Sequence, residues 1–80
     1  MEKYIKKAKT IYSKWKEAEK EWDIFYKNNT FNRAFWKIDK KIIKLKKEAN
    51  SLPYNTYPIQ TTDDLLGYFE FHELNLLNHN

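Results

Sequence analysis

The sequence contains no cysteine, one glycine, two prolines and no long run of uncharged apolar residues. Without cysteine the chain forms no disulfide and has no thiolate for catalysis or metal binding. The scarcity of glycine and proline argues against an all-β chain and against a disordered one. No apolar stretch approaches the roughly 18 residues that a membrane-spanning helix requires.

Chain length and residue usage limit the organisation of the protein and its source. At 80 residues the chain is expected to form a single domain. Its length is near the lower limit for folding without disulfides or a structural metal. Charges occur within residues 1–7, where a signal peptide would need an apolar core, so we expect a cytoplasmic protein. Fourteen lysines accompany one arginine, and asparagine, isoleucine and tyrosine are frequent. Their AT-rich codons favour a low-GC bacterium, or its phage or plasmid.

The first third of the chain has the apolar spacing of a helix. Between residues 2 and 27, apolar side chains recur at alternating intervals of four and three, which is the pattern of a helix seam. The seam consists of Tyr4, Ala8, Ile11, Trp15, Ala18, Trp22 and Phe25. Ile5, Tyr12 and Tyr26 widen this stripe on one side. We therefore predict a helix over residues 2–27.

A second helix, over about residues 31–49, is predicted after a polar break. Asn28, Asn29 and Thr30 are residue types that favour turns and helix caps over helix interiors. A new seam follows the break and is displaced by one residue from the first. It comprises Phe31, Phe35, Ile38, Ile42, Leu45 and Ala49. The displacement indicates a turn between two helices.

Reversal of the chain at this turn would match the two seams residue by residue. Near the turn, Trp22 is expected to face Phe35. At the other end, Tyr4 is expected to face Leu52. Such apolar matching is typical of antiparallel helices joined by a short loop. The sequence therefore predicts an all-α fold built on a helical hairpin, and a single rod over residues 2–49 is the alternative.

The remaining residues are predicted to form a connector, residues 51–60, and an acidic C-terminal element, residues 61–80. Pro53 ends the second helix, and Pro58 keeps the connector from becoming helical. A pair of threonines followed by two aspartates then resembles a helix start. Its apolar face would comprise Leu65, Leu66, Phe69, Leu76 and Leu77. A short third helix is therefore preferred to an edge strand within residues 65–77.

Charge is distributed unevenly along the chain. Residues 1–50 carry all fifteen basic residues and seven acidic ones, a net charge of +8. Residues 51–80 carry four acidic residues and no basic one, a net charge of −4. In a hairpin, twelve lysines would gather toward the end opposite the turn. They would keep an aromatic-rich surface soluble, attract the acidic C-terminal segment, or bind an external partner such as nucleic acid or an acidic protein.

Two aromatic-rich segments lie off the predicted seams. Trp36 and Ile43 are seven residues apart and form a second stripe on the second helix. We expect the C-terminal segment to cover this stripe; the alternative is an exposed patch of the kind that anchors protein interfaces. Tyr54 and Tyr57 lie in the connector. The candidate partner-binding residues are Trp36, Ile43, Lys37, Lys40, Lys41, Lys44, Lys47, Lys3, Lys6, Lys7, Tyr54 and Tyr57.

The sequence offers no candidate catalytic residue, metal site or cofactor site. Gly67 is the only glycine, so the chain cannot form a glycine-rich phosphate-binding loop. Ser13 and Ser51 have no nucleophile motif around them. His72 and His79 supply at most two metal ligands, which do not complete a site. We therefore expect a protein that is not an enzyme and has no cofactor.

The expected function is stoichiometric binding of another protein, a larger enzyme or complex, with no membrane partner. Small size, surplus aromatics and AT-rich composition favour a phage or mobile-element inhibitor of a host or defence enzyme, similar in kind to the anti-CRISPR proteins. One alternative is nonspecific nucleic-acid binding through the lysine-rich end, because a single arginine argues against sequence readout. Another is a self-associating structural module, such as a homodimer.

Overall fold

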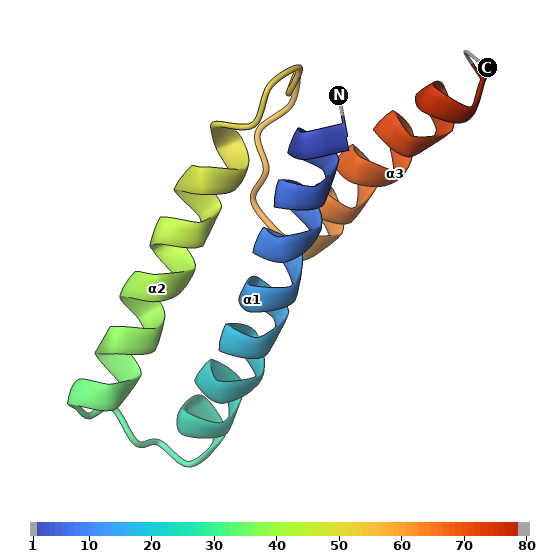
Figure 1. Ribbon diagram of the computed structural model, residues 1–80. Coiled ribbons are helices and arrows are strands. Elements are labelled where there is room, and N and C mark those ends of the chain that lie inside the picture. The colour runs from blue at the N-terminus through green and yellow to red at the C-terminus, as the bar shows by residue number, and fades with distance from the viewer. Residues whose placement is uncertain (1, 79–80) are drawn as a thin grey trace.

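A computed structural model describes residues 2–78 and contains three helices (Figure 1). These are α1 (Glu2–Lys27), α2 (Arg33–Asn50) and α3 (Thr62–Asn78). No strand occurs within residues 2–78, which confirms the all-α class and makes the third element a helix. Among these residues, no helix combines the length and apolar character needed to cross a bilayer.

Helices α1 and α2 pack antiparallel along the predicted seams. The seam residues that are buried are Ala8, Ile11, Trp15, Ala18, Phe35, Leu45 and Ala49. Near the turn, the ring centroids of Trp22 and Phe35 lie 5.6 Å apart, as the matching predicted. Toward the other end, the small side chains of Ala8 and Ala49 are fully buried, which lets the two helices approach closely. The hairpin prediction is confirmed, and the single-rod alternative is wrong.

Asparagines form the turn and start the second helix. Asn29 has φ of 52°, in the left-handed region that asparagine tolerates better than most residues. The Asn32 side-chain oxygen accepts a hydrogen bond from the Phe35 N–H at 3.1 Å and caps α2. The helix therefore begins at Arg33, two residues later than predicted, because Asn32 is the cap and Phe31 precedes it.

The connector is tied to the end of α2 by the side chain of Asn50. Its Nδ2 donates to the Ile59 carbonyl at 2.9 Å, and its Oδ1 accepts from the Ile59 N–H at 2.8 Å. The same nitrogen donates to the Lys46 carbonyl at 2.8 Å. One amide thus satisfies both backbone groups of Ile59, while the apolar side chains of Leu52 and Ile59 enter the core.

Helix α3 begins at a reciprocal cap. Thr61 Oγ1 accepts from the Asp64 N–H at 3.3 Å. Asp64 Oδ2 in turn accepts from the N–H groups of Gln60 at 2.9 Å and Thr61 at 3.1 Å. These backbone donors, Gln60 first and Thr61 next, lower the pKa of Asp64 below its ordinary value of 3.8. The arrangement is a capping box and confirms the predicted threonine start.

Helix α3 packs mainly against α1, and Figure 1 shows α1 between the other two helices. Leu65, Tyr68 and Phe69 are buried in this contact. The rings of Tyr12 and Phe69 meet edge to face, with centroids 5.5 Å apart. The side chains of Leu76 and Leu77, predicted on the same face, lie outside the described residues.

The described chain is elongated, and its two halves contain different numbers of helices. Its extents are 50 × 19 × 18 Å and its radius of gyration is 14.5 Å, against about 12 Å for a compact chain of this length. Helix α3 lies beside the half of α1 far from the turn, which we call the open end (Figure 1). The opposite half, the turn end, has only α1 and α2.

Candidate protein-binding surfaces

The outward side of α2 is exposed, contrary to the expectation that the C-terminal segment covers it. Trp36 is 55% exposed and Ile43 is 48% exposed. Helix α3 instead packs on α1, where Ile5 and Tyr12 broaden the apolar stripe. The apolar side chains of α3 are buried against this stripe and not against α2. The prediction that the C-terminal segment covers Trp36 and Ile43 is therefore wrong.

Lysines surround these two apolar residues. Positions 36, 40, 43 and 47 share one side of α2 by helical spacing, opposite its buried seam. We define the α2 outer face by its exposed residues Arg33, Trp36, Lys37, Lys40, Lys41, Ile43, Lys44 and Lys47. Within the described side chains the ion pairs are Lys9 with Glu73 and Lys27 with Asp23, so none neutralises a cation of this face. The face is therefore both strongly positive and partly apolar.

A group of aromatic rings at the turn end adjoins this face. The buried ring of Phe35 lies at the centre of this group. Its centroid is 5.0 Å from that of the Phe31 ring and 5.1 Å from that of the Trp36 ring. Tyr26 stacks on Trp22 at 4.9 Å and meets Phe31 at 6.1 Å. We define the turn-end patch by the exposed members of this group, Tyr26, Phe31 and Trp36.

Sequence reasoning found only Trp36 of the turn-end patch. Phe31 was assigned to the seam, and Tyr26 was assigned to the widened stripe of the first helix. The broader stripe of α1 runs on to Tyr26, whereas α3 begins beside the middle of α1 and runs away from the turn, so it leaves this part of the stripe uncovered (Figure 1). Trp22, expected in the core, is only half-buried for the same reason.

The lysines of the first helix lie at the open end. Lys3, Lys6 and Lys7 are exposed near the start of α1, beside the end of α2 that carries Lys44 and Lys47. The predicted gathering of lysines at this end is thus present. An intramolecular partner occurs for Lys9, which pairs with Glu73 of α3. The acidic C-terminal helix therefore meets the basic end at this one ion pair among the described side chains.

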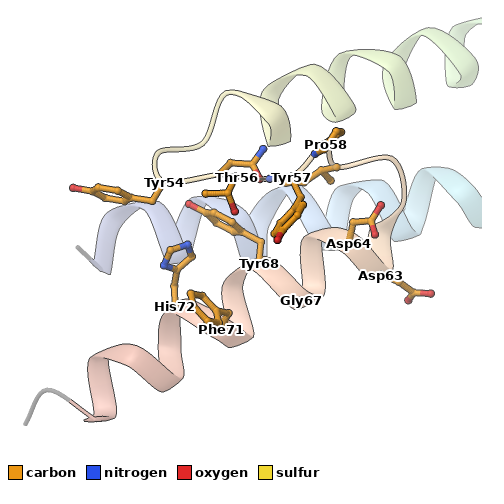
Figure 2. Close-up of a pocket in the computed structure, with 12 residues that line it drawn as sticks. Tyr54, Thr56, Tyr57, Pro58, Asp63, Asp64, Gly67, Tyr68, Phe71 and His72 are labelled. Carbon is orange, nitrogen blue, oxygen red and sulfur yellow. Dashed lines mark hydrogen bonds between the residues drawn. The ribbon is translucent and has the colours of Figure 1, made fainter.

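A cleft of about 580 Å³ lies between the connector and α3 (Figure 2). Tyr54, Tyr57 and Pro58 line it from the connector, and Gly67 and Phe71 line it from α3. Tyr54 and Tyr57, both predicted as binding residues, are among the most exposed aromatic side chains of the described chain. We call this the connector cleft.

A cluster of rings closes one end of the connector cleft. Tyr54 has φ of 62°, an unfavourable backbone conformation for a bulky residue, and its ring lies 5.7 Å from that of Tyr4. The Tyr68 hydroxyl donates to the Pro53 carbonyl at 2.5 Å. Burial, and then the neighbouring Tyr4 and Tyr54, raise the pKa of Tyr68 to about 12. Tyr68 therefore remains a neutral hydrogen-bond donor at physiological pH.

His72 belongs to the ring cluster at the connector cleft. His72 is surrounded by rings, with centroids 4.5 Å from Tyr68 and 5.3 Å from Tyr4. Within the described part of the chain, no three metal-ligating side chains lie together. His79, the other predicted histidine, lies outside the described residues.

Two aromatic surfaces and one basic helix face are thus the features from which a function can be inferred. Comparison with known protein families, with curated proteins and with solved structures finds no significant match to the chain.

Proposed function

We propose that this protein binds another protein stoichiometrically through the turn-end patch and the adjoining α2 outer face. The observation that carries the proposal is the exposure of large apolar side chains where no third helix covers the hairpin. Exposed aromatic residues that adjoin one another are typical of interface anchors.

The rings of the turn end are held in place before any partner binds. Each ring of the patch contacts another ring at a centroid distance between 4.9 and 6.1 Å. Such packing restricts side-chain rotation, so a partner would lose less conformational entropy on binding them than on binding isolated side chains. The buried Phe35 supports this arrangement from below.

The cations of the α2 outer face specify the chemistry of the partner. Five of them, Lys37, Lys40, Lys41, Lys44 and Lys47, are exposed lysines predicted to contact it. An acidic surface with an apolar recess for Trp36 would complement this face. The lysines would mainly accelerate association, because charge at an interface rim affects the rate of encounter more than the final affinity. The further expectation of a host or defence enzyme as the target stays a prediction from composition.

Affinity capture with matched bait variants tests the proposal. Wild-type protein, a Trp36→Ala variant and a Lys14→Ala variant are each immobilised and exposed to nuclease-treated lysate of a low-GC bacterium. We expect one saturable protein partner with the wild type and with Lys14→Ala, an exposed control outside the proposed surface. Truncation of a central aromatic anchor typically costs at least about 2 kcal/mol, so Trp36→Ala should weaken this binding about 30-fold or more.

Two results would contradict the proposal. Equal capture by Trp36→Ala and the wild type would show that the turn-end patch is not the interface. Capture from a parallel untreated lysate that disappears after nuclease treatment, together with steeply salt-dependent binding to any duplex, would instead establish the nucleic-acid alternative. Circular dichroism of each bait confirms that the variants retain their helices.

A further inference from the structure

The outward side of α3 carries the opposite charge to that of α2. Asp63, Gly67, Glu70, Phe71 and Leu74 share this side by helical spacing, and we call it the α3 outer face. Phe71 is 60% exposed and Leu74 is 59% exposed. Asp63 and Glu70 are exposed, and neither forms an ion pair among the described side chains. Residues 51–80 contain no base, so the face is acidic and partly apolar.

The two outer faces are similar in length and opposite in the sign of their charge. Helix α2 has 18 residues and α3 has 17, so either offers a surface of similar length. Each combines two exposed apolar side chains with charges of one sign: Trp36 and Ile43 on α2, and Phe71 and Leu74 on α3. The two helices lie on different sides of α1, so neither outer face contacts the other within one molecule (Figure 1).

The middle of the α3 outer face is shallow. At Gly67, no atom lies within 4 Å of the place that a Cβ would occupy. Gly67 also lines the connector cleft, next to Phe71. An apolar side chain from outside can therefore approach the helix backbone between Asp63 and Phe71.

We propose that the α3 outer face of one copy binds the α2 outer face of a second copy. The apolar residue Trp36 or Ile43 would pack over Gly67, and the lysines beside it would face Asp63 and Glu70. The contact joins two different surfaces, so it is heterologous and can repeat from copy to copy. It goes beyond the proposed function, and it would compete with the external partner because both use the α2 outer face.

Sedimentation velocity with charge-reversed variants tests this contact. The wild type should associate as its concentration rises from micromolar to about millimolar, and added salt should reverse the association. A double variant, Asp63→Lys with Glu70→Lys, makes both outer faces basic. A second, fourfold variant, Lys37→Glu with Lys40→Glu, Lys41→Glu and Lys44→Glu, leaves four acids against Arg33 and Lys47, so the α2 outer face becomes acidic like the α3 outer face. Each alone should associate at least about tenfold more weakly than the wild type, because like charges would meet.

Mixing the two variants gives the decisive measurement. An equimolar mixture places the basic α2 face of one variant before the acidic α3 face of the other, so association should return to at least wild-type strength. A wild type that stays monomeric throughout, either variant alone associating as the wild type does, or a mixture that stays monomeric would each overturn the proposal.

The outcome is separable from that of the partner-binding proposal. The variant Asp63→Lys with Glu70→Lys retains the turn-end patch and the whole α2 outer face. It should therefore lose self-association and still capture the external partner in the bait experiment. A wild type that captures the partner but does not self-associate refutes only the contact between copies. A wild type that self-associates but captures no partner refutes only the partner surface.

Discussion

Trp15 and Trp36 show how differently one residue type is used in this chain. Trp15 is 2% exposed and lies on the seam between α1 and the other elements, whereas Trp36 stands on the outside of α2. Burial of a large ring contributes several kcal/mol to folding, while an exposed ring contributes little. We therefore expect Trp15 to serve stability and Trp36 to serve the proposed binding.

Alanine substitution should separate these two roles. Trp15→Ala is expected to lower the free energy of unfolding by about 3–5 kcal/mol, because it leaves a cavity in the core. Trp36→Ala should lower it by at most about 1 kcal/mol, since it removes mainly edge contacts with Phe35. Urea denaturation followed by circular dichroism measures both. Comparable losses in the two variants would contradict the assignment.

Asn50 is the polar residue on which the connector depends most. Asn50→Ala removes three hydrogen bonds and leaves both backbone groups of Ile59 without their partner. We expect a loss of about 1–3 kcal/mol in the free energy of unfolding, the usual cost of unsatisfied polar groups. Asn55→Ala is the matched control, because Asn55 accepts only a long 3.4 Å bond from the Tyr57 N–H. Equal stability of the two variants would refute this role.

At the scale of the element, α3 depends on a charged cap. The folded-state pKa of Asp64 is depressed, so the ionised cap stabilises the protein above the unfolded value of 3.8. That contribution is lost as the pH falls through the lower folded pKa. The stability difference between the wild type and Asp64→Asn should therefore shrink below about pH 4. Denaturation curves recorded between pH 2 and pH 7 measure this difference, and a difference that stays constant over the whole range would contradict the role of the ionised cap.

Gly67 lowers the stability of α3, because glycine has a lower helix propensity than alanine. No neighbouring atom occupies the space of a Cβ, and its φ is not positive. Gly67→Ala should therefore raise the free energy of unfolding by about 0.5–1 kcal/mol, through helix propensity alone. The reverse change at an exposed site of α2, Ala34→Gly, should lower it by a similar amount. A destabilising Gly67→Ala would show that the position is sterically restricted.

Helix periodicity predicted most of the elements but not which helix α3 packs against. The alternating seams determined the hairpin and the Trp22–Phe35 pair, because apolar matching across two antiparallel helices leaves few other registers. Three asparagines near the turn are all suitable caps, so the sequence alone did not select Asn32. The position of α3 depends on the combined stripe of Ile5 and Tyr12, and periodicity alone does not indicate which element packs on that stripe. For that reason the sequence favours cover over Trp36 and Ile43 and offers their exposure only as the alternative.

At the scale of the whole molecule, stability is expected to differ between the two ends. The open end has three elements around its core, whereas the turn end has two helices and partly exposed rings. Local opening requires least free energy where few apolar contacts are lost. Amide hydrogen exchange should therefore be faster for residues 19–25 and 33–38 than for residues 5–16 and 62–69. Uniform protection along α1 would contradict this prediction.

Helix α1 begins at the open end and helix α3 ends there, and the long dimension of the described chain is 50 Å. A fluorophore, affinity tag or surface anchor attached at either terminus would thus stand far from the rings of Tyr26, Phe31 and Trp36. Immobilisation by a terminus would present those rings to solution, while a bulky fusion would crowd the helices that meet at the opposite pole.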